Sequence, residues 1–227
     1  MRVTFPRLAD HQEGYSVIER DDGVVYGMRG ALVGRELPHD VRHLIVEREL
    51  RVSDGIWGSI AAGTVYQSMH HLRGRQSPHS AERSERLKKA QRERIMCAEL
   101  LANLVEAIAA LDDPSLEAIG RLTRERLSAI PLVEPGSSPL SVIGCPPPEA
   151  LAAAASALQV EAARWARLRV GEELVYEWPA PKPPTPPVRA LRPVPKPAVP
   201  KNSVPKNSAP KVPKQRDGGR GPFKGRP

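Results

Sequence analysis

Two histidines one helical turn apart are the residues of this sequence best suited to chemistry. His39 and His43 are the first and last residues of the segment HDVRH at 39–43. Proline is favoured at the first position of a helix, so Pro38 indicates that a helix begins there. On a helix from 38 to 50, side chains four residues apart lie on one face with about 5 to 6 Å between their Cβ atoms. That separation suits two imidazole ligands of one zinc ion. One interpretation of the pattern is therefore a zinc site, with zinc as the cofactor, and the other is the structural interpretation given below.

Further ligands are expected from the same helix and from the next one. A second helix is expected from 56 to 72, packed antiparallel to the first. At a rise of about 1.5 Å per residue, this helix would pass the level of His39 shortly before residue 70. Two more histidines would then lie within reach of His39 and His43. The candidates for the remaining ligands are Glu47, His70 and His71.

The segment HDVRH is also similar to the HExxH element of the zincin hydrolases. In that family the glutamate is the general base, and here Asp40 takes its place with a side chain one methylene shorter. Hydrolysis is therefore less well supported than metal binding. The alternative is structural: both histidines are partly buried polar residues, Asp40 sits favourably at the positive end of the helix dipole, and Glu47 pairs with Arg51 at the surface.

Charge and proline divide the chain into two parts. The net charge is +8, yet residues 180–227 hold twelve Lys or Arg and one acid, which leaves 22 basic and 25 acidic residues in 1–179. The same tail contains fourteen of the 25 prolines. Such a composition cannot bury enough apolar surface to offset the entropy of ordering it. We therefore expect a globular domain over 1–179 and a disordered, basic tail over 180–227. The net charge of the domain gives no support for nucleic-acid binding by the domain itself.

The tail carries two patterns that favour binding to a partner. One matches PxxPxR, a ligand pattern for aromatic grooves, and the other is a lysine about every five residues, which favours an anionic partner such as nucleic acid, an acidic protein or an acidic membrane. The residues concerned are Pro184, Pro187, Arg189, Lys196, Lys201, Lys206 and Lys211. The alternative is a solubilising tether with no dedicated partner.

The order of expected elements predicts an α+β fold. An N-terminal β-hairpin turns at Asp22-Gly23, a dipeptide typical of two-residue turns, and a C-terminal strand alternates apolar and polar residues. Together they form a small antiparallel sheet packed on about five helices, of which 56–72, apolar on nearly every side, is expected to be the central buried one. The expected strands span 3–5, 15–20, 24–28 and 173–178, and the expected helices span 38–50, 56–72, 80–111, 113–130 and 148–169.

No segment reads as a signal peptide or as a membrane span of about 20 apolar residues, and Cys97 and Cys145 form no CxxC pair. We therefore expect a cytoplasmic protein without a transmembrane segment.

Three segments resemble a group of uncharacterised proteins of high-GC Gram-positive (actinobacterial) bacteria. They are LPHDVRHLIVE at 37–47, GIWGSIAAG at 55–63 and the terminal strand ELVYEWP at 173–179. The resemblance implies a shared fold over 1–179 and carries no known activity.

Two functions remain open on these grounds. The first is a cytosolic binding or regulatory protein whose basic tail tethers it to a partner. The second is a zinc-dependent hydrolase that uses the HDxxH helix. Convergence of ligand atoms on one point would distinguish them, because zinc needs nitrogen or oxygen atoms at about 2.0 to 2.2 Å.

Overall fold

The computed structural model describes residues 1–112, 114–128 and 144–179, and it contains a five-stranded antiparallel sheet packed with six helices. The strands are β1 (Arg2–Pro6), β2 (Glu13–Glu19), β3 (Val25–Leu32), β4 (Met69–Arg73) and β5 (Glu173–Glu177). The helices are α1 (His39–Glu49), α2 (Ile56–Ala62), α3 (Ser80–Ala90), α4 (Arg92–Ala109), α5 (Leu116–Ser128) and α6 (Pro148–Arg167). The predicted α+β class is confirmed.

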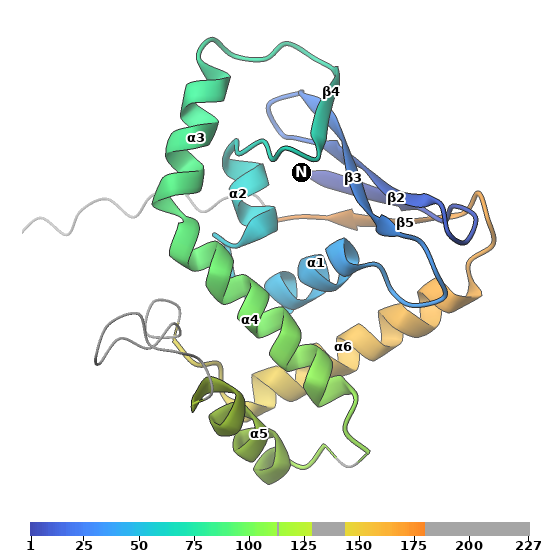
Figure 1. Ribbon diagram of the computed structural model, residues 1–227, viewed down its shortest axis with the longest axis vertical. Helices are drawn as coiled ribbons and strands as arrows, with labels where there is room; N and C mark the ends of the chain where they lie inside the picture. Colours follow the sequence, from blue (N-terminus) through green and yellow to red (C-terminus); the bar gives the residue numbers. More distant parts are fainter. Residues whose placement is uncertain (113, 129–143, 180–227) are drawn as a thin grey trace, which may run out of the picture. The chain divides into compact units, whose positions relative to one another are not determined.

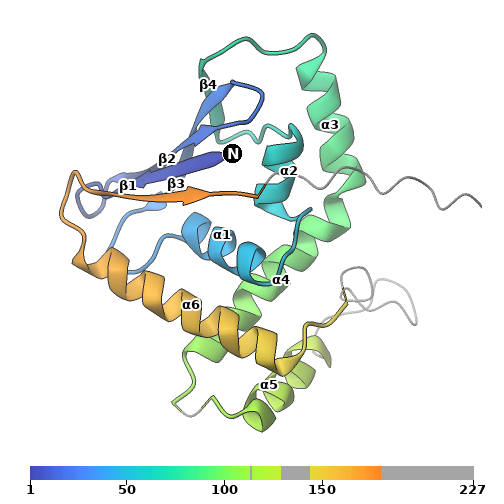
Figure 2. The ribbon, with the colours of Figure 1, turned by 180° about the vertical axis from the view of Figure 1, so that it is seen from behind.

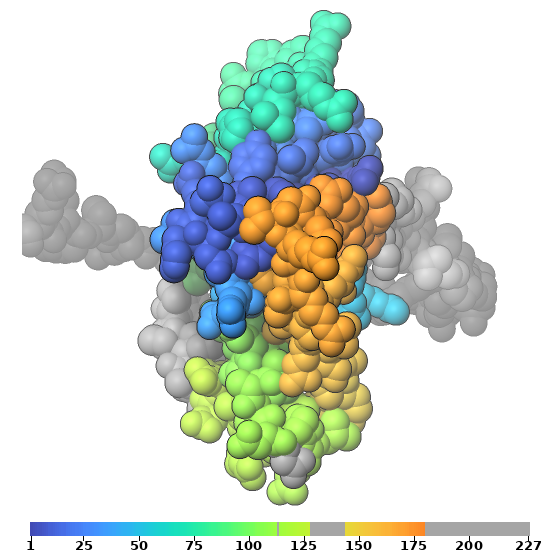
Figure 3. Space-filling view, turned by 90° about the vertical axis from the view of Figure 1, so that its right-hand side faces the viewer, coloured from blue at the N-terminus to red at the C-terminus, as the bar shows by residue number. Residues whose placement is uncertain are grey.

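The sheet has the order β4-β3-β2-β1-β5, so both chain-terminal strands of the domain lie side by side. β5 pairs with β1 in the register Val3↔Tyr176, as the expected closing strand should. Figure 3 shows the N-terminal strands and the α6–β5 segment next to each other on one face of the molecule. On β1 and β5 buried residues alternate with more exposed ones, which is the pattern of a sheet covered by helices on one face.

The N-terminal hairpin forms where the sequence predicts it, with a turn one residue longer than expected. Arg20 and Val24 close the turn, since Arg20 N–H donates to the carbonyl of Val24 at 3.0 Å. Three residues lie between them, and Gly23 adopts a left-handed φ of 79°. A glycine in this conformation is typical of three-residue hairpin loops.

The predicted helix over 56–72 is wrong beyond its first two turns. α2 ends at Ala62 because Gly63 takes a left-handed conformation, with φ 119°, that stops the helix. The chain then turns and enters β4, which pairs with β3. Only Met69 of the five β4 residues is buried, so the expected central buried helix is replaced here by an exposed edge strand.

The central buried helix is α1. It lies between the sheet and the helices α4 and α6 in both ribbon views (Figure 1, Figure 2). Its buried residues face both layers and include Val41, Leu44 and Ile45, each with no exposed surface. The expected helical hairpin of α1 and 56–72 is thus replaced by α1 against α4 and α6, and the candidate ligands of α1 face α4.

The long helix expected over 80–111 is divided at Gln91 into α3 and α4. As expected, apolar residues of the second half enter the core, among them Leu101, Val105 and Ile108. In α3 the buried residue is Ser84, whose hydroxyl accepts a hydrogen bond from the backbone N–H of Val65 at 2.9 Å. This bond ties α3 to the chain between α2 and β4.

The loop before α1 is held by α6. Trp165 is almost fully buried, and its indole N–H donates to the carbonyl of Gly34 at 3.2 Å. The guanidinium of Arg7 lies 5.3 Å from the centre of the Trp165 ring, a distance at which cation–π attraction is favourable. These contacts fix the approach to Pro38 and hence the start of α1. No helix among the described residues is long and apolar enough to span a bilayer.

We predict that Gly63→Ala lowers the free energy of unfolding by about 1 to 3 kcal/mol, because alanine is strained in the left-handed conformation that ends α2. The measurement is urea unfolding followed by circular dichroism. Gly34→Ala is the control, since Gly34 has no positive φ and a Cβ there meets nothing within 4 Å. It should change stability by less than about 0.5 kcal/mol. Equal stability of the two variants would contradict the prediction.

Candidate metal centre

Three side chains from two helices gather at one point. His39 and His43 lie one turn apart on α1, and Glu99 reaches them from α4; one ligand atom from each lies within 4.8 Å of the other two. Nε2 of His43 is 3.1 Å from Oε2 of Glu99, and Nε2 of His39 is 3.8 Å from the same oxygen. The pair predicted from the sequence therefore converges with a third ligand.

The two distances to Glu99 are close to those between ligands of a tetrahedral zinc site. Ligands at about 2.0 to 2.1 Å from a zinc ion stand about 3.3 to 3.4 Å from one another at tetrahedral angles. The two observed distances to Glu99 lie on either side of that value. Two imidazoles and one carboxylate are also a ligand set found in catalytic zinc sites, which leave a fourth position for water. The residues present thus fit a zinc ion.

Burial differs among the three residues and leaves the cluster open on one side. The His43 side chain is only 2% exposed, whereas those of His39 and Glu99 are 48% and 41% exposed. His43 is held in the middle of α1, inside the core, and the other two side chains line the entrance. A ligand can therefore approach from solvent without displacing core residues.

Each imidazole has a second carboxylate near its other nitrogen. Nδ1 of His39 is 3.8 Å from Oδ1 of Asp40, and Nδ1 of His43 is 3.7 Å from Oε1 of Glu47. Both separations are charge contacts rather than hydrogen bonds. In metal sites a histidine ligand commonly donates its other ring N–H to a carboxylate, which fixes the ring orientation. Here Asp40 and Glu47 stand on that side of the two rings, but Nδ1 of His43 has no hydrogen-bond partner among the described residues.

Glu47 is placed as a partner of His43 and as a cap of α2. Its carboxylate accepts hydrogen bonds from the backbone N–H groups of Ile56 at 2.9 Å and Trp57 at 3.0 Å. Both oxygens are therefore already engaged at the start of α2. The alternative in which Glu47 pairs with Arg51 at the surface is wrong, because Glu47 is only 1% exposed.

The charges around His43 favour its protonated form when no metal is bound. Burial by itself lowers the pKa of His43, but the nearby carboxylates of Glu47 and Glu99 outweigh it, so the pKa is raised. Burial also raises the pKa of Glu47. The pKa of Asp40 is raised by burial too, against the opposing effect of the two histidines.

A pocket of about 260 Å³ opens beside the cluster. Its lining combines the cluster, Asp40 and Ser68 with apolar and aromatic residues, namely Met28, Ile56, Trp57, Tyr66 and Ile95. Trp57 is fixed there by its indole N–H, which donates to the carbonyl of Asp40 at 3.0 Å. A small group or one side chain of a ligand fits in this volume.

Tyr66 contributes a polar oxygen to the pocket wall. The hydroxyl of Ser59 donates to the carbonyl of Ile56 at 2.7 Å, so in its 2.8 Å contact with Tyr66 the serine accepts and the phenol donates. Burial raises the pKa of Tyr66. The phenolic oxygen is left as an acceptor for an N–H group of a ligand.

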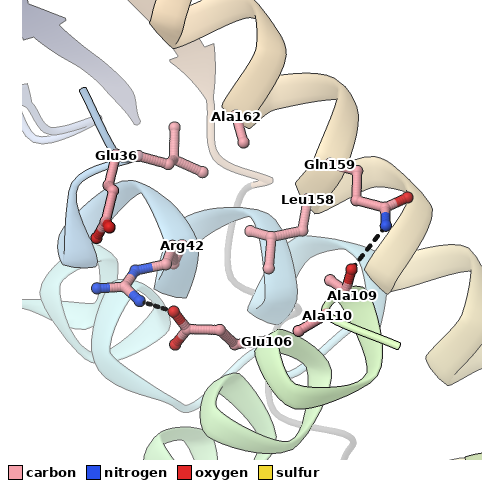
Figure 4. Close-up of a pocket in the computed structure, with 9 residues that line it drawn as sticks. Glu36, Arg42, Glu106, Ala109, Ala110, Leu158, Gln159 and Ala162 are labelled. Atoms are coloured by element: carbon pink, nitrogen blue, oxygen red, sulfur yellow. Dashed lines mark hydrogen bonds and ion pairs between the residues drawn. The ribbon is translucent and has the colours of Figure 1, made fainter. Parts of the chain in front are cut away.

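A second pair of side chains connects α4 with α1. Arg42 pairs with Glu106, which lies seven residues after Glu99 on α4 and hence on the same helix face. Figure 4 shows this pair at the edge of another pocket, of about 280 Å³, between α1, α4 and α6. There the amide of Gln159 donates to the carbonyl of Ala109. The Arg42–Glu106 pair is thus a second polar contact between α1 and α4, beside that of His43 with Glu99.

The structure does not bring the other two predicted histidines to the cluster. His70 and His71 belong to β4, where Nε2 of His70 contacts the hydroxyl of Tyr15 at 3.2 Å and Nε2 of His71 contacts the carbonyl of Gly74 at 2.8 Å. Their expected place beside His39 depended on a helix through residue 72, which does not form. Among the described residues, the cluster that could hold a metal consists of His39, His43 and Glu99.

Sequence reasoning missed Glu99, although a signal was present. Glu99 is a single acid between Met96-Cys97-Ala98 and Leu100-Leu101, on the half of the helix that enters the core. A lone carboxylate in such an apolar stretch is a candidate for a polar contact with a neighbouring element. The candidate binding residues of the tail, from Pro184 to Lys211, lie outside the described residues, so the tethering role stays a prediction.

Comparisons with protein-family models, with curated proteins and with solved structures find no match to this chain. The proposed resemblance to actinobacterial proteins therefore stays a prediction. The function proposed below is inferred from the geometry of the cluster.

We predict that Glu47→Ala lowers the free energy of unfolding by about 3 kcal/mol, because it leaves two buried N–H groups of α2 without an acceptor and opens a cavity. The measurement is again urea unfolding. The matched control is Glu49→Ala, which removes an exposed glutamate from the same helix and should cost less than about 0.5 kcal/mol. A small effect of Glu47→Ala would show that the cap contributes little.

Proposed function

We propose that this protein is a zinc-dependent hydrolase whose metal is held by His39, His43 and Glu99. One observation carries the proposal: these three ligand atoms converge beside a pocket that reaches solvent. A closed site with four protein ligands is typical of structural zinc, whereas three ligands and an open side are typical of catalytic zinc. A zinc ion in such a site lowers the pKa of bound water and polarises carbonyl groups.

Asp40 is the proposed proton acceptor. It lines the same pocket and adjoins the first ligand in the sequence. Burial raises its pKa, which makes its carboxylate a better acceptor near neutral pH. The proposed division of labour is that His43 and its partner Glu47 anchor the site, His39 and Glu99 complete the ligand set, and Asp40 takes a proton from the attacking water.

We predict that the purified full-length chain takes up stoichiometric zinc and that Glu99→Gln weakens zinc binding by at least about 100-fold. The loss should exceed the 10- to 100-fold cost of removing an outer partner of a ligand. Zinc affinity is measured by competition with a chromophoric chelator. Glu99 is 41% exposed, so this variant should fold.

The control is His70→Ala, which removes a histidine predicted from the sequence but placed on β4. It should bind zinc like the unmodified chain. Equal affinity of Glu99→Gln and the unmodified chain, or loss of zinc in His70→Ala, would overturn the assigned ligand set.

We predict that Asp40→Asn, assayed at saturating zinc, loses hydrolysis by about 10²- to 10⁴-fold, the usual contribution of a positioned general base, while its zinc affinity falls by no more than the 10- to 100-fold cost of an outer partner. The readout is the rate of cleavage of a pool of quenched fluorescent peptides by zinc-loaded protein. A variant with full zinc and full activity would remove Asp40 from the mechanism.

A further inference from the structure

Two arginine side chains from different elements meet at the glycine that ends α2. Arg20 closes the turn between β2 and β3, and Arg83 lies in the first turn of α3, which stands beside α2 in both ribbon views (Figure 1, Figure 2). A Cβ built on Gly63 would lie 3.6 Å from Nη2 of Arg20 and 3.6 Å from Nε of Arg83. The two nitrogens therefore stand at most twice that distance apart, and both border the space that the glycine leaves beside its Cα.

Both guanidinium groups contain a buried donor that lacks a partner. The Arg20 side chain is only 7% exposed. Its Nε and the Nε of Arg83 are buried without a hydrogen-bond partner among the described residues, and so is the hydroxyl of Thr64, the residue after Gly63. Native proteins leave few buried polar groups unpaired, and each such group calls for an explanation such as a bound water or ion.

The charges at this point are not balanced. Asp22 pairs with Nη2 of Arg20 and is itself 42% exposed. Arg83 donates to the hydroxyl of Ser77 at 2.8 Å, but it has no carboxylate partner in the part of the chain that the structure describes. Two cations and one carboxylate leave a net positive charge. Burying such a charge is costly unless a further anion compensates it.

An alternative role for the two arginines is to cap the last turn of α2, because the carbonyl end of a helix attracts cations. Such a cap would donate hydrogen bonds to the carbonyls of that turn. Within the described ranges, the hydrogen bonds of the two guanidinium groups go instead to Asp22 and Ser77. The two Nε–H groups thus remain free to bind a ligand.

We propose that Arg20 and Arg83 form a binding site for a phosphate group. Guanidinium is well suited to this ligand, since its planar set of N–H donors matches the oxygens of a phosphate. Nitrogens this close together can donate to different oxygens of one tetrahedral ion, because each N–H···O bond spans about 2.9 Å. Neither arginine lines the metal pocket, so this site is separate from the proposed hydrolytic centre and goes beyond it.

The test is calorimetric titration of inorganic phosphate into the zinc-free, full-length protein, so that no metal contributes to binding. Phosphate should bind one site with a Kd of about 1 mM or tighter, which two charge-assisted hydrogen bonds are enough to supply. Acetate, a planar anion of lower charge, should bind at least about 10-fold more weakly. Equal affinity for acetate and phosphate would overturn the assignment to phosphate.

The matched variants are Arg83→Gln and Arg86→Gln. Both remove one positive charge from α3, but Arg86 is exposed, and only Arg83 borders Gly63. Arg83→Gln should weaken phosphate binding by about 10- to 100-fold, the loss of one charge-assisted hydrogen bond. Arg86→Gln should weaken it by less than about 2-fold, because salt screens an exposed charge. If Arg83→Gln does not fold by circular dichroism, Arg83→Lys replaces it, since lysine keeps the charge and loses the planar donors.

Phenyl phosphate identifies the source of the group. If it binds as tightly as inorganic phosphate, the site accepts the phosphate of a larger ligand, and if only inorganic phosphate binds, the site takes the free ion; both results support the site. No saturable binding of phosphate, or equal losses in Arg83→Gln and Arg86→Gln, would overturn the site. Either of these failures leaves the metal centre standing, because the titration contains no zinc.

Discussion

The buried carboxylate of Glu47 is the interaction on which the rest of the structure depends. A charge in the core needs compensation from several polar groups, and Glu47 finds it in two backbone N–H groups of α2 and in the His43 ring. Gly55 permits this arrangement, because a Cβ there would lie 2.6 Å from the carboxylate and 2.9 Å from Ala98. One side chain thus joins the last turn of α1 to the start of α2.

The arrangement of the candidate metal centre follows from the position of Glu47. His43 lies between two carboxylates, Glu47 on the core side and Glu99 on the solvent side. The inner carboxylate is fixed by the fold, so the ring presents Nε2 outward to the position where His39 and Glu99 meet. The site is therefore rigid on its inner side and open on its outer side, as a centre that holds a metal and admits a ligand must be.

The sheet packs against α1 on the side opposite α4 and α6. α1 packs between the sheet and the pair α4 and α6, and the connection from α2 to β4 carries Tyr66 and Ser68 past the cluster. Because Gly63 ends α2 early, the chain returns to the sheet as an edge strand instead of covering the site as a helix. The connection that Gly63 begins lines the pocket with Tyr66 and Ser68 and then leads into β4.

The sequence by itself determined the α+β class, the N-terminal hairpin, the closing strand and the pair His39 and His43, because turn residues, alternation and helical spacing are local properties. Only the tertiary structure decided the third ligand, since Glu99 is 56 residues from His43 in the chain. The tertiary structure also places Glu47 as the cap of α2 and places His70 and His71 on the sheet. Those outcomes depend on how α1 and α4 pack and on the conformation of Gly63, which no local pattern contains.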